Sequence, residues 1–250
     1  MHRAFIDEIF SSIQGEGILV GQRHLFIRFH GCSLRCHYCD TITSIGSPGF
    51  CTVEKTPGKK DMYLVPNPIT SKKLTEILLR LKRTSKTLHS ALAITGGEPL
   101  EQTDFLLEWL PQVKKYFTIF LETNGIHPAY LKRLIRYVDT IGMDIKLPSS
   151  TAQREFWEEH ESFLRIANKK RLFVKIVVTA DTDKYELLKA GALISKVDRK
   201  IPTILQPVTP FRLVHQSPTS AQLMDSQEYL SGLLDEVRVI PQVHKLCSFP

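Results

Sequence analysis

Short apolar runs alternate with stretches of helical periodicity along most of the chain. The apolar runs predict strands because they are short, rich in branched residues and bounded by glycine or polar residues. They occupy residues 25–29, 91–95, 117–121, 140–145, 173–178, 203–205 and 237–240. Between them, apolar residues recur at three- and four-residue spacing, which predicts helices from residue 71 and over 105–113, 128–137, 151–168, 184–194 and 220–234.

This alternation predicts the fold class α/β, with mostly parallel strands and helices covering the sheet. Six strand–helix units followed by a terminal strand are too few for a closed eight-unit barrel, so we expect an incomplete (β/α)6 barrel. In such folds the site forms where the strands end at their carboxyl termini.

The region between the first predicted strand and the helix at residue 71 breaks the pattern. Residues 43–69 are rich in glycine, proline, serine and lysine. We interpret them as an ordered insertion or a flexible loop near the site, with no helix before Thr70. We expect residues 1–250 to form a single domain that carries this insertion.

Composition narrows the class of protein. The chain has 250 residues, of which 42% are hydrophobic and 24% charged, as in soluble globular proteins. It has no apolar stretch of eighteen residues, and its first residues carry acids too early for a signal peptide, so we expect a cytoplasmic protein. The net charge of +7 comes from scattered lysines and arginines, which does not favour nucleic-acid binding.

Three cysteines lie within eight residues, as Cys32, Cys36 and Cys39. Four thiolates would close a zinc or iron–sulfur site, whereas three leave one coordination position open for chemistry. The alternatives are a zinc site completed by His30, His37, Cys51 or Cys247, and three purely structural cysteines.

Other polar motifs follow the predicted strands. They are Thr95-Gly96-Gly97-Glu98-Pro99, Glu122-Thr123-Asn124-Gly125, Asp144-Ile145-Lys146 and Gln206-Pro207-Val208-Thr209. Each alone could be a turn, but together they place polar groups at successive strand ends. The guanidinium of Arg28 suits a substrate carboxylate, and the amide of Gln14 suits the edge of a pterin or guanine-like ring.

Taken together, these motifs resemble the 7-carboxy-7-deazaguanine synthase family of radical S-adenosylmethionine (SAM) enzymes. The resemblance runs through SIQGEG, the Arg28 strand, CSLRCHYCDT, TGGEP, ETNG, DIKLPSS, QPVTP and PQVHK. It implies a radical SAM barrel that contains a [4Fe–4S] cluster. It also implies a carbon–nitrogen lyase that converts 6-carboxy-5,6,7,8-tetrahydropterin to 7-carboxy-7-deazaguanine with loss of ammonia, in queuosine and 7-deazapurine biosynthesis.

The resemblance also assigns residues and partners. It implies that Cys32, Cys36 and Cys39 bind the cluster, and that Thr41 binds Mg²⁺. The implied SAM contacts are Tyr38, Cys39, Asp40, Gly97, Asp144, Ile145, Lys146, Gln206, Pro207, Val208 and Thr209. The implied substrate contacts are Ile13, Gln14, Gly15, Arg28, Thr95 and the terminal Pro250. The family further implies a homodimer and an electron donor such as flavodoxin or ferredoxin. From the composition and charge we expect no membrane and no nucleic-acid partner.

Two other functions are compatible with parts of the pattern. A glycyl-radical enzyme activase shares the cysteine spacing but has no need for the QGEG segment or for Arg28. A non-catalytic zinc-binding or RNA-binding module would use the cysteines without iron.

Overall fold

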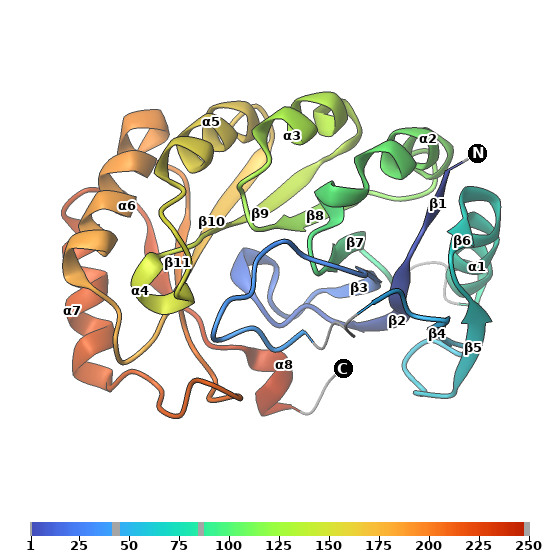
Figure 1. Ribbon diagram of the computed structural model, residues 1–250, viewed down its shortest axis with the longest axis horizontal. Coiled ribbons are helices and arrows are strands. Elements are labelled where there is room, and N and C mark those ends of the chain that lie inside the picture. The colour runs from blue at the N-terminus through green and yellow to red at the C-terminus, as the bar shows by residue number, and fades with distance from the viewer. Residues whose placement is uncertain (1, 42–45, 85–87, 248–250) are drawn as a thin grey trace.

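The computed structural model describes residues 2–41, 46–84 and 88–247, and a ten-stranded sheet forms its centre (Figure 1). Its strand order is β12-β11-β10-β9-β8-β7-β3-β2-β4-β5. The strands are β2 (Ile6–Ile13), β3 (Arg23–Phe29), β4 (Phe50–Glu54), β5 (Met62–Pro66), β7 (Ala91–Gly96), β8 (Ile119–Thr123), β9 (Thr140–Ile145), β10 (Arg171–Val178), β11 (Thr203–Pro207) and β12 (Val237–Val239). A separate pair, β1 (Arg3–Ala4) and β6 (Ile69–Thr70), is antiparallel.

Strand β2 is antiparallel to β3, whereas every pair of adjacent strands is parallel in the run β3-β7-β8-β9-β10-β11-β12. A helix follows each of the first six, and these helices form the outer layer (Figure 1). They are α1 (Ser71–Arg83), α2 (Thr103–Val113), α3 (Pro128–Leu134), α5 (Trp157–Ala167), α6 (Lys184–Asp198) and α7 (Ser220–Ser231). The predicted incomplete (β/α)6 barrel is confirmed. Shorter elements are α4 (Pro148–Thr151), α8 (Val243–Leu246) and the 3₁₀ turns η1 (Gly17–Leu19), η2 (Pro99–Gln102) and η3 (Ile135–Tyr137).

Strand alternation divides the apolar residues into two cores. Side chains that face the helices form the larger core, which includes Leu25, Ile27 and Ile145. Side chains that face the inside of the barrel form a smaller one, made of Phe10, Leu19, Phe26, Ala91, Ala93, Phe120, Phe173 and Ile204. The Phe10 and Phe26 rings stack at 5.2 Å between centroids. This inner core fills the barrel below the carboxyl ends of the strands.

Several sequence-based expectations differ from the structure. The third strand spans Ile119–Thr123 rather than 117–121. The helix expected over 128–137 ends at Leu134 and continues as the turn η3. The helix expected over 151–168 is two helices, because Ala152 adopts a left-handed conformation with φ of 55° and ends α4, whereas α5 begins only at Trp157.

For residues 43–69, the described part agrees with the ordered-insertion alternative and contains no helix. It forms an antiparallel hairpin of β4 and β5. The hairpin joins the sheet through β2, a strand that was not predicted. Residues 42–45 lie outside the described part of the chain.

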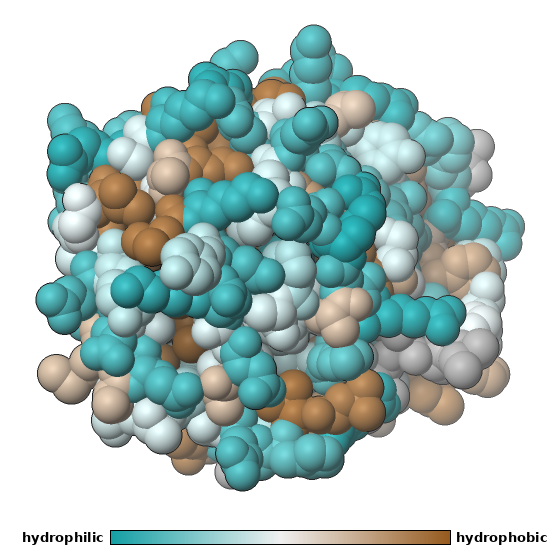
Figure 2. All heavy atoms as spheres, turned by 60° about the vertical axis from the view of Figure 1, so that its left-hand side comes forward, coloured by the Kyte–Doolittle hydropathy of each residue, from teal (hydrophilic) through white to brown (hydrophobic). Residues whose placement is uncertain are grey.

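Charged and polar side chains cover most of one face of the molecule, with small apolar patches between them (Figure 2). This agrees with a charged fraction of 24%. Among the described residues, no helix combines the length and the apolar character needed to span a bilayer.

Candidate active site

A cavity of about 640 Å³ lies at the carboxyl ends of the parallel strands. Its floor is a polar layer that sits two residues further along the strands than the inner apolar core. Since side chains two apart on a strand share a face, Phe26, Ala93 and Phe120 are followed on the inner face by Arg28, Thr95 and Glu122. Asp144, Lys175 and Gln206 complete this layer, and all six line the cavity.

The cysteine loop forms one wall of the same cavity. Cys32, Cys36 and Cys39 all line it, and the loop closes on itself through a hydrogen bond from the Cys39 N–H to the Cys36 carbonyl at 3.0 Å. Burial raises the pKa of Cys32 to about 11 and also raises that of Cys36. The thiols of Cys32 and Cys36 are therefore protonated in the free protein, and metal binding must release their protons.

Among the residues that the structure describes, no three histidine, cysteine or carboxylate side chains are placed to hold one ion. The ring nitrogens of His30 contact Asp7 at 2.8 Å and the Gly46 carbonyl at 2.7 Å, and Cys51 is fully buried in the outer core. Three soft thiol donors on the wall of a roomy cavity instead fit a polynuclear iron–sulfur cluster.

The Gly-Gly-Glu turn after β7 packs directly against the cysteine loop. Gly96 has φ of +120°, and a Cβ on Gly97 would lie 1.9 Å from the Gly31 carbonyl oxygen. The Glu98 N–H donates to that same carbonyl at 2.7 Å. Glycine is therefore required at both positions for the two loops to approach each other.

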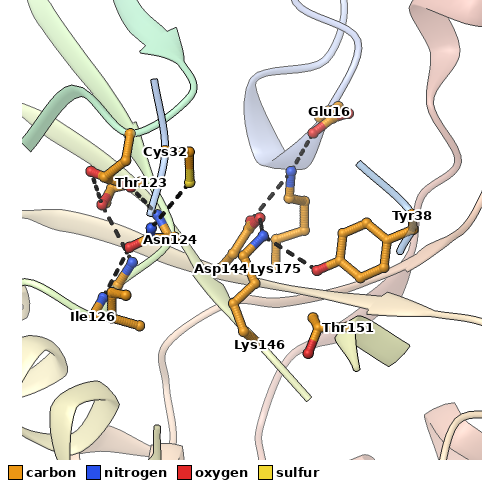
Figure 3. A network of polar contacts seen from close by, with 12 residues as sticks. Glu16, Cys32, Tyr38, Thr123, Asn124, Ile126, Asp144, Lys146, Thr151 and Lys175 are labelled. Atoms are coloured by element: carbon orange, nitrogen blue, oxygen red, sulfur yellow. Dashed lines mark hydrogen bonds and ion pairs between the residues drawn. The ribbon is translucent and has the colours of Figure 1, made fainter. Parts of the chain in front are cut away.

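The buried side chain of Glu98 does not line the cavity and supports the turn after β8. Its carboxylate accepts hydrogen bonds from the Leu100 N–H at 3.0 Å, the Thr123 hydroxyl at 2.8 Å and the Asn124 N–H at 2.7 Å. Burial raises the pKa of Glu98 to about 7, although these bonds oppose the rise. The Asn124 side-chain amide in turn donates to Cys32 Sγ at 3.9 Å (Figure 3).

A chain of alternating charges crosses the cavity floor (Figure 3). The Lys175 ammonium contacts Glu16 and also Asp144, at 3.3 Å. The Lys146 ammonium contacts Asp144 at 2.6 Å and the Tyr38 hydroxyl at 3.3 Å. The network therefore links the loop after β2 to the cysteine loop.

The pKa values of this network follow from its pairing. Burial alone would raise the pKa of Glu16 and Asp144, but the neighbouring ammonium groups outweigh it and hold both values below the usual range. Burial would lower the pKa of Lys146 and Lys175, but nearby negative charges outweigh it and raise both values. Among these charges, Asp144 has the largest effect. All four groups are therefore charged at neutral pH.

Residues Gln14, Gly15 and Glu16, which follow β2, form another wall. The Gln14 side-chain amide donates to Glu122 at 2.8 Å, and its oxygen accepts from the Glu16 N–H at 3.0 Å. Burial, followed by the charge of Glu16, raises the pKa of Glu122. Arg28 approaches from β3, with its Nε 3.1 Å from Glu8 and its guanidinium 5.8 Å from the Phe10 ring centroid.

Residues near the end of the chain complete the rim. The Val243 N–H donates to the Gly15 carbonyl at 2.9 Å. The Gln242 side-chain amide donates to Glu16 at 2.9 Å and to Asp40 at 3.2 Å, and Lys245 pairs with Asp40 at 2.6 Å. The segment preceding and including α8 thus ties the loop after β2 to the cysteine loop.

The cavity gathers most of the residues expected from the sequence. It is lined by Ile13, Gln14, Gly15, Arg28, Cys32, Cys36, Tyr38, Cys39, Asp40, Thr41, Thr95, Gly97, Asp144, Lys146, Gln206 and Val208. The expected SAM contacts Ile145, Pro207 and Thr209 do not line it, and the Ile145 side chain packs in the outer core. Pro250 lies outside the described residues.

The cavity also contains groups that sequence reasoning gave no role. Lys175 and His244 line it. A single lysine within the otherwise apolar run Phe173–Val178 was the available signal for Lys175, because an unpaired charge is rarely placed in a buried strand. The sequence holds no comparable signal for His244.

Comparisons with known proteins agree with this geometry. Residues 26–190 match the Radical SAM superfamily. The chain is 43% identical over 244 residues to a 7-carboxy-7-deazaguanine synthase of Geobacter sulfurreducens, covering 97% of this chain and 96% of that protein. The corresponding protein of Methanothermobacter thermautotrophicus is 35% identical over 262 residues, with coverage of 97% and 96%.

A solved structure shows the same fold. The crystal structure of QueE from Escherichia coli matches with a TM-score of 0.63 at 21% identity, covering 97% of this chain and 95% of that one. The chain therefore belongs to the radical SAM superfamily and, within it, to the 7-carboxy-7-deazaguanine synthase family.

Proposed function

We infer that this protein is an enzyme that converts 6-carboxy-5,6,7,8-tetrahydropterin to 7-carboxy-7-deazaguanine with loss of ammonia, as a carbon–nitrogen lyase of queuosine and 7-deazapurine biosynthesis. One observation carries this inference: the three cysteines and a polar floor suited to a carboxylated pterin line the same cavity. A radical generated at the cysteine loop would thus form next to the substrate, enclosed by protein on the floor and sides.

Cys32, Cys36 and Cys39 would hold a [4Fe–4S] cluster and leave one iron open for SAM. When bound, the reduced cluster and SAM supply the one-electron chemistry that activates a carbon–hydrogen bond of the substrate. The protein contributes placement, charge balance and exclusion of water.

The SAM side of the cavity is the wall next to the cysteine loop. Lys146, Asp144, Tyr38 and Asp40 offer charged and hydrogen-bonding groups there. Gln206 is buried, and its Oε1 has no hydrogen-bond partner among the described residues. An unpaired buried acceptor of this kind fits a ligand that donates a hydrogen bond. Gly97 and Val208 also line this wall, whereas Ile145, Pro207 and Thr209 could contribute only through the main chain or after a rearrangement.

The substrate side is the wall formed by Ile13, Gln14, Gly15, Arg28 and Thr95. Within the described part of the chain, the side chain of Arg28 is hydrogen-bonded only through Nε, to Glu8. Its two terminal nitrogens can therefore bind the pterin carboxylate bidentately. Gln14 and Glu122 offer the donor and acceptor groups that a pterin edge requires.

Further family properties are part of this proposal. The Thr41 hydroxyl lines the cavity next to Asp40, where it could serve as an oxygen ligand for Mg²⁺. A flavodoxin or ferredoxin would supply the electron, and Pro250 would reach the substrate. We also propose that the protein is a homodimer and that residues 1–250 form one domain with its insertion at 43–69.

Loss of a cluster ligand tests the function directly. Anaerobically reconstituted protein should be brown, contain iron and sulfide, and convert the carboxy-tetrahydropterin to a product with the ultraviolet spectrum of a deazaguanine. Cys36→Ala should lose the cluster and all activity while remaining folded, because two thiolates cannot retain it. Iron analysis, circular dichroism and product spectra measure these outcomes.

Cys247→Ala is the matched control, since Cys247 is an exposed free cysteine that does not line the cavity. It should retain the iron content of the wild type. Activity retained in Cys36→Ala would reject the cluster assignment, whereas SAM cleavage without a deazaguanine would reject the substrate. Protein that binds zinc and no iron would favour the non-catalytic alternative.

A further inference from the structure

His160 lies outside the cavity but connects two of the strand ends that form it. The residue is on α5, in the outer layer of helices, and its side chain is fully buried. It lies between the turn that follows β8 and the residue that follows β9. Its sequence context, Trp157–Ala167, reads only as an amphipathic helix, so its role becomes visible in three dimensions.

Both ring nitrogens of His160 have main-chain partners. The Lys146 N–H donates to Nε2 at 3.0 Å, and Nδ1 lies 3.2 Å from the Gly125 carbonyl oxygen. An amide N–H can only donate and a carbonyl can only accept, so the partners require the neutral tautomer with the proton on Nδ1. Burial, the largest effect, lowers the pKa of His160 to about 4, which keeps the ring in this neutral form.

The two segments held by His160 both reach the cysteine loop on their other side. Lys146 contacts the Tyr38 hydroxyl at 3.3 Å, and Asn124, next to Gly125, donates to Cys32 Sγ at 3.9 Å (Figure 3). One imidazole therefore sets the spacing between two strand ends whose side chains contact the cysteine loop.

We propose that His160 is a positioning residue of the active site. It aligns the ends of β8 and β9 so that Asn124 and Lys146 hold the cysteine loop in the position that binds SAM. This rests on the proposed function. An apolar side chain of similar size could fill the space, but it would leave a buried N–H and a buried carbonyl without partners. The strand ends would then separate to find water or other partners.

Amide hydrogen exchange in the cluster-free protein tests the alignment without turnover. His160→Leu removes both hydrogen bonds, and exchange of the Lys146 amide should become at least about tenfold faster. In cluster-loaded protein without pterin, the same variant should bind SAM about tenfold more weakly. His160→Gln, whose side-chain oxygen can accept from Lys146, should recover SAM affinity to within about threefold of the wild type.

Leu164→Ala is the control, because Leu164 is fully buried on the same helix and packs in the outer core. It should lower the unfolding midpoint yet leave SAM affinity within about twofold of the wild type. An unchanged Lys146 exchange rate in His160→Leu, or equal losses of SAM affinity in His160→Leu and Leu164→Ala, would overturn the proposal. If His160→Leu does not fold, His160→Met, which also lacks the N–H donor and the nitrogen acceptor, is compared with Leu164→Ala by the same measurements, and equal results for the two variants would overturn the proposal.

These measurements remain informative if the proposed function fails. A wild type that cleaves SAM but makes no deazaguanine would reject the pterin substrate alone. The exchange rate and the SAM affinity of the His160 variants would still report whether this histidine aligns the two strands.

Discussion

Lys175 is the central charge of the cavity floor. It pairs with Glu16 from the loop after β2 and with Asp144 from β9, and its side chain is 16% exposed. Removing one partner of a buried ion pair is more damaging than the pair itself is stabilising, because the remaining charge stays buried. Lys175 therefore stabilises the fold as well as the site.

Lys175→Met should lower the free energy of unfolding by about 3 kcal/mol at pH 7, since Glu16 and Asp144 would remain ionised without it. The wild-type pKa values of both carboxyls are held below the usual range, so their contribution is present at neutral pH and is lost as the pH falls through those values. The deficit of the variant should therefore shrink below about pH 4. Denaturant unfolding at pH 7 and pH 4 measures this difference.

Lys196→Met provides a surface control. Lys196 pairs with Glu161 but is 60% exposed, so its removal should change the free energy of unfolding by less than about 1 kcal/mol at either pH. If Lys175→Met and Lys196→Met change the free energy of unfolding equally, Lys175 does not compensate the buried charges of Glu16 and Asp144.

At the level of elements, the hairpin of β4 and β5 widens the sheet beyond the barrel. Only two residue pairs join β4 to β2, Glu8 with Thr52 and Ile9 with Val53. Beyond them, the nearly fully buried Glu54 extends the attachment, because its carboxylate accepts from the Ser11 N–H at 2.9 Å and the Lys60 N–H at 3.0 Å.

Glu54→Ala should loosen this attachment. Leaving the buried Ser11 N–H without its charged acceptor costs about 2 kcal/mol. Hydrogen exchange over residues 50–66 should speed up more than exchange in the parallel strands, because the hairpin opens locally. Glu76→Ala, on the exposed face of α1, should stay within about 0.5 kcal/mol of the wild type. Uniformly faster exchange across the sheet would contradict a local role for Glu54.

The parallel strands were predictable because burial on both faces makes them continuous apolar runs. The strand β2 was not, since its run Ile6–Ile13 includes Asp7, Glu8 and two serines and lies at the transition to the antiparallel part of the sheet. The break between α4 and α5 was hidden for another reason: residues 152–156 contain no proline or glycine, and only tertiary packing sets Ala152 in its left-handed conformation.

The candidate site was predictable in its motifs but not in its pairings. The cysteine loop and the strand ends stand out in the sequence because their residue types are unusual there. The contact between Glu16 and Lys175 spans 159 residues, and that between Glu16 and Gln242 spans 226. Such partners are set by the closure of the whole barrel, which no local pattern encodes.

For the whole molecule, buried histidines predict acid sensitivity. His24 is fully buried in the barrel between Phe26 and Phe120, and neither ring nitrogen has a hydrogen-bond partner in the described part of the chain. Burial, with a smaller effect from His89, lowers its pKa to about 4. The unfolded chain binds a proton at this residue below about pH 6.5, whereas the folded protein does so only near pH 4.

Stability should therefore fall between pH 6.5 and pH 4. From pH 7 to pH 5, a histidine of this kind costs about 2 kcal/mol of unfolding free energy. His24→Leu should remove most of the loss of unfolding free energy that His24 causes between pH 7 and pH 5. His215→Leu, at an exposed position, should leave the pH dependence of the unfolding free energy unchanged. Guanidinium unfolding at pH 7 and pH 5 measures this loss of unfolding free energy. If His24→Leu loses as much between the two pH values as the wild type, the folded protein protonates this ring.

The alternating charges on the cavity floor have a consequence for ligand selection. Two ammonium groups, Lys146 and Lys175, already face two carboxylates, Glu16 and Asp144. A chloride or phosphate ion would have to displace the carboxylates of Glu16 and Asp144 from the two lysines, and its binding free energy there would be small. At these four groups, a molecule that brings cationic as well as anionic groups, such as a zwitterionic amino acid moiety, can exchange partners and leave every charge matched. This part of the floor thus selects a ligand by an exchange of partners, whereas Arg28 offers two terminal nitrogens, unpaired within the described residues, to an anion alone.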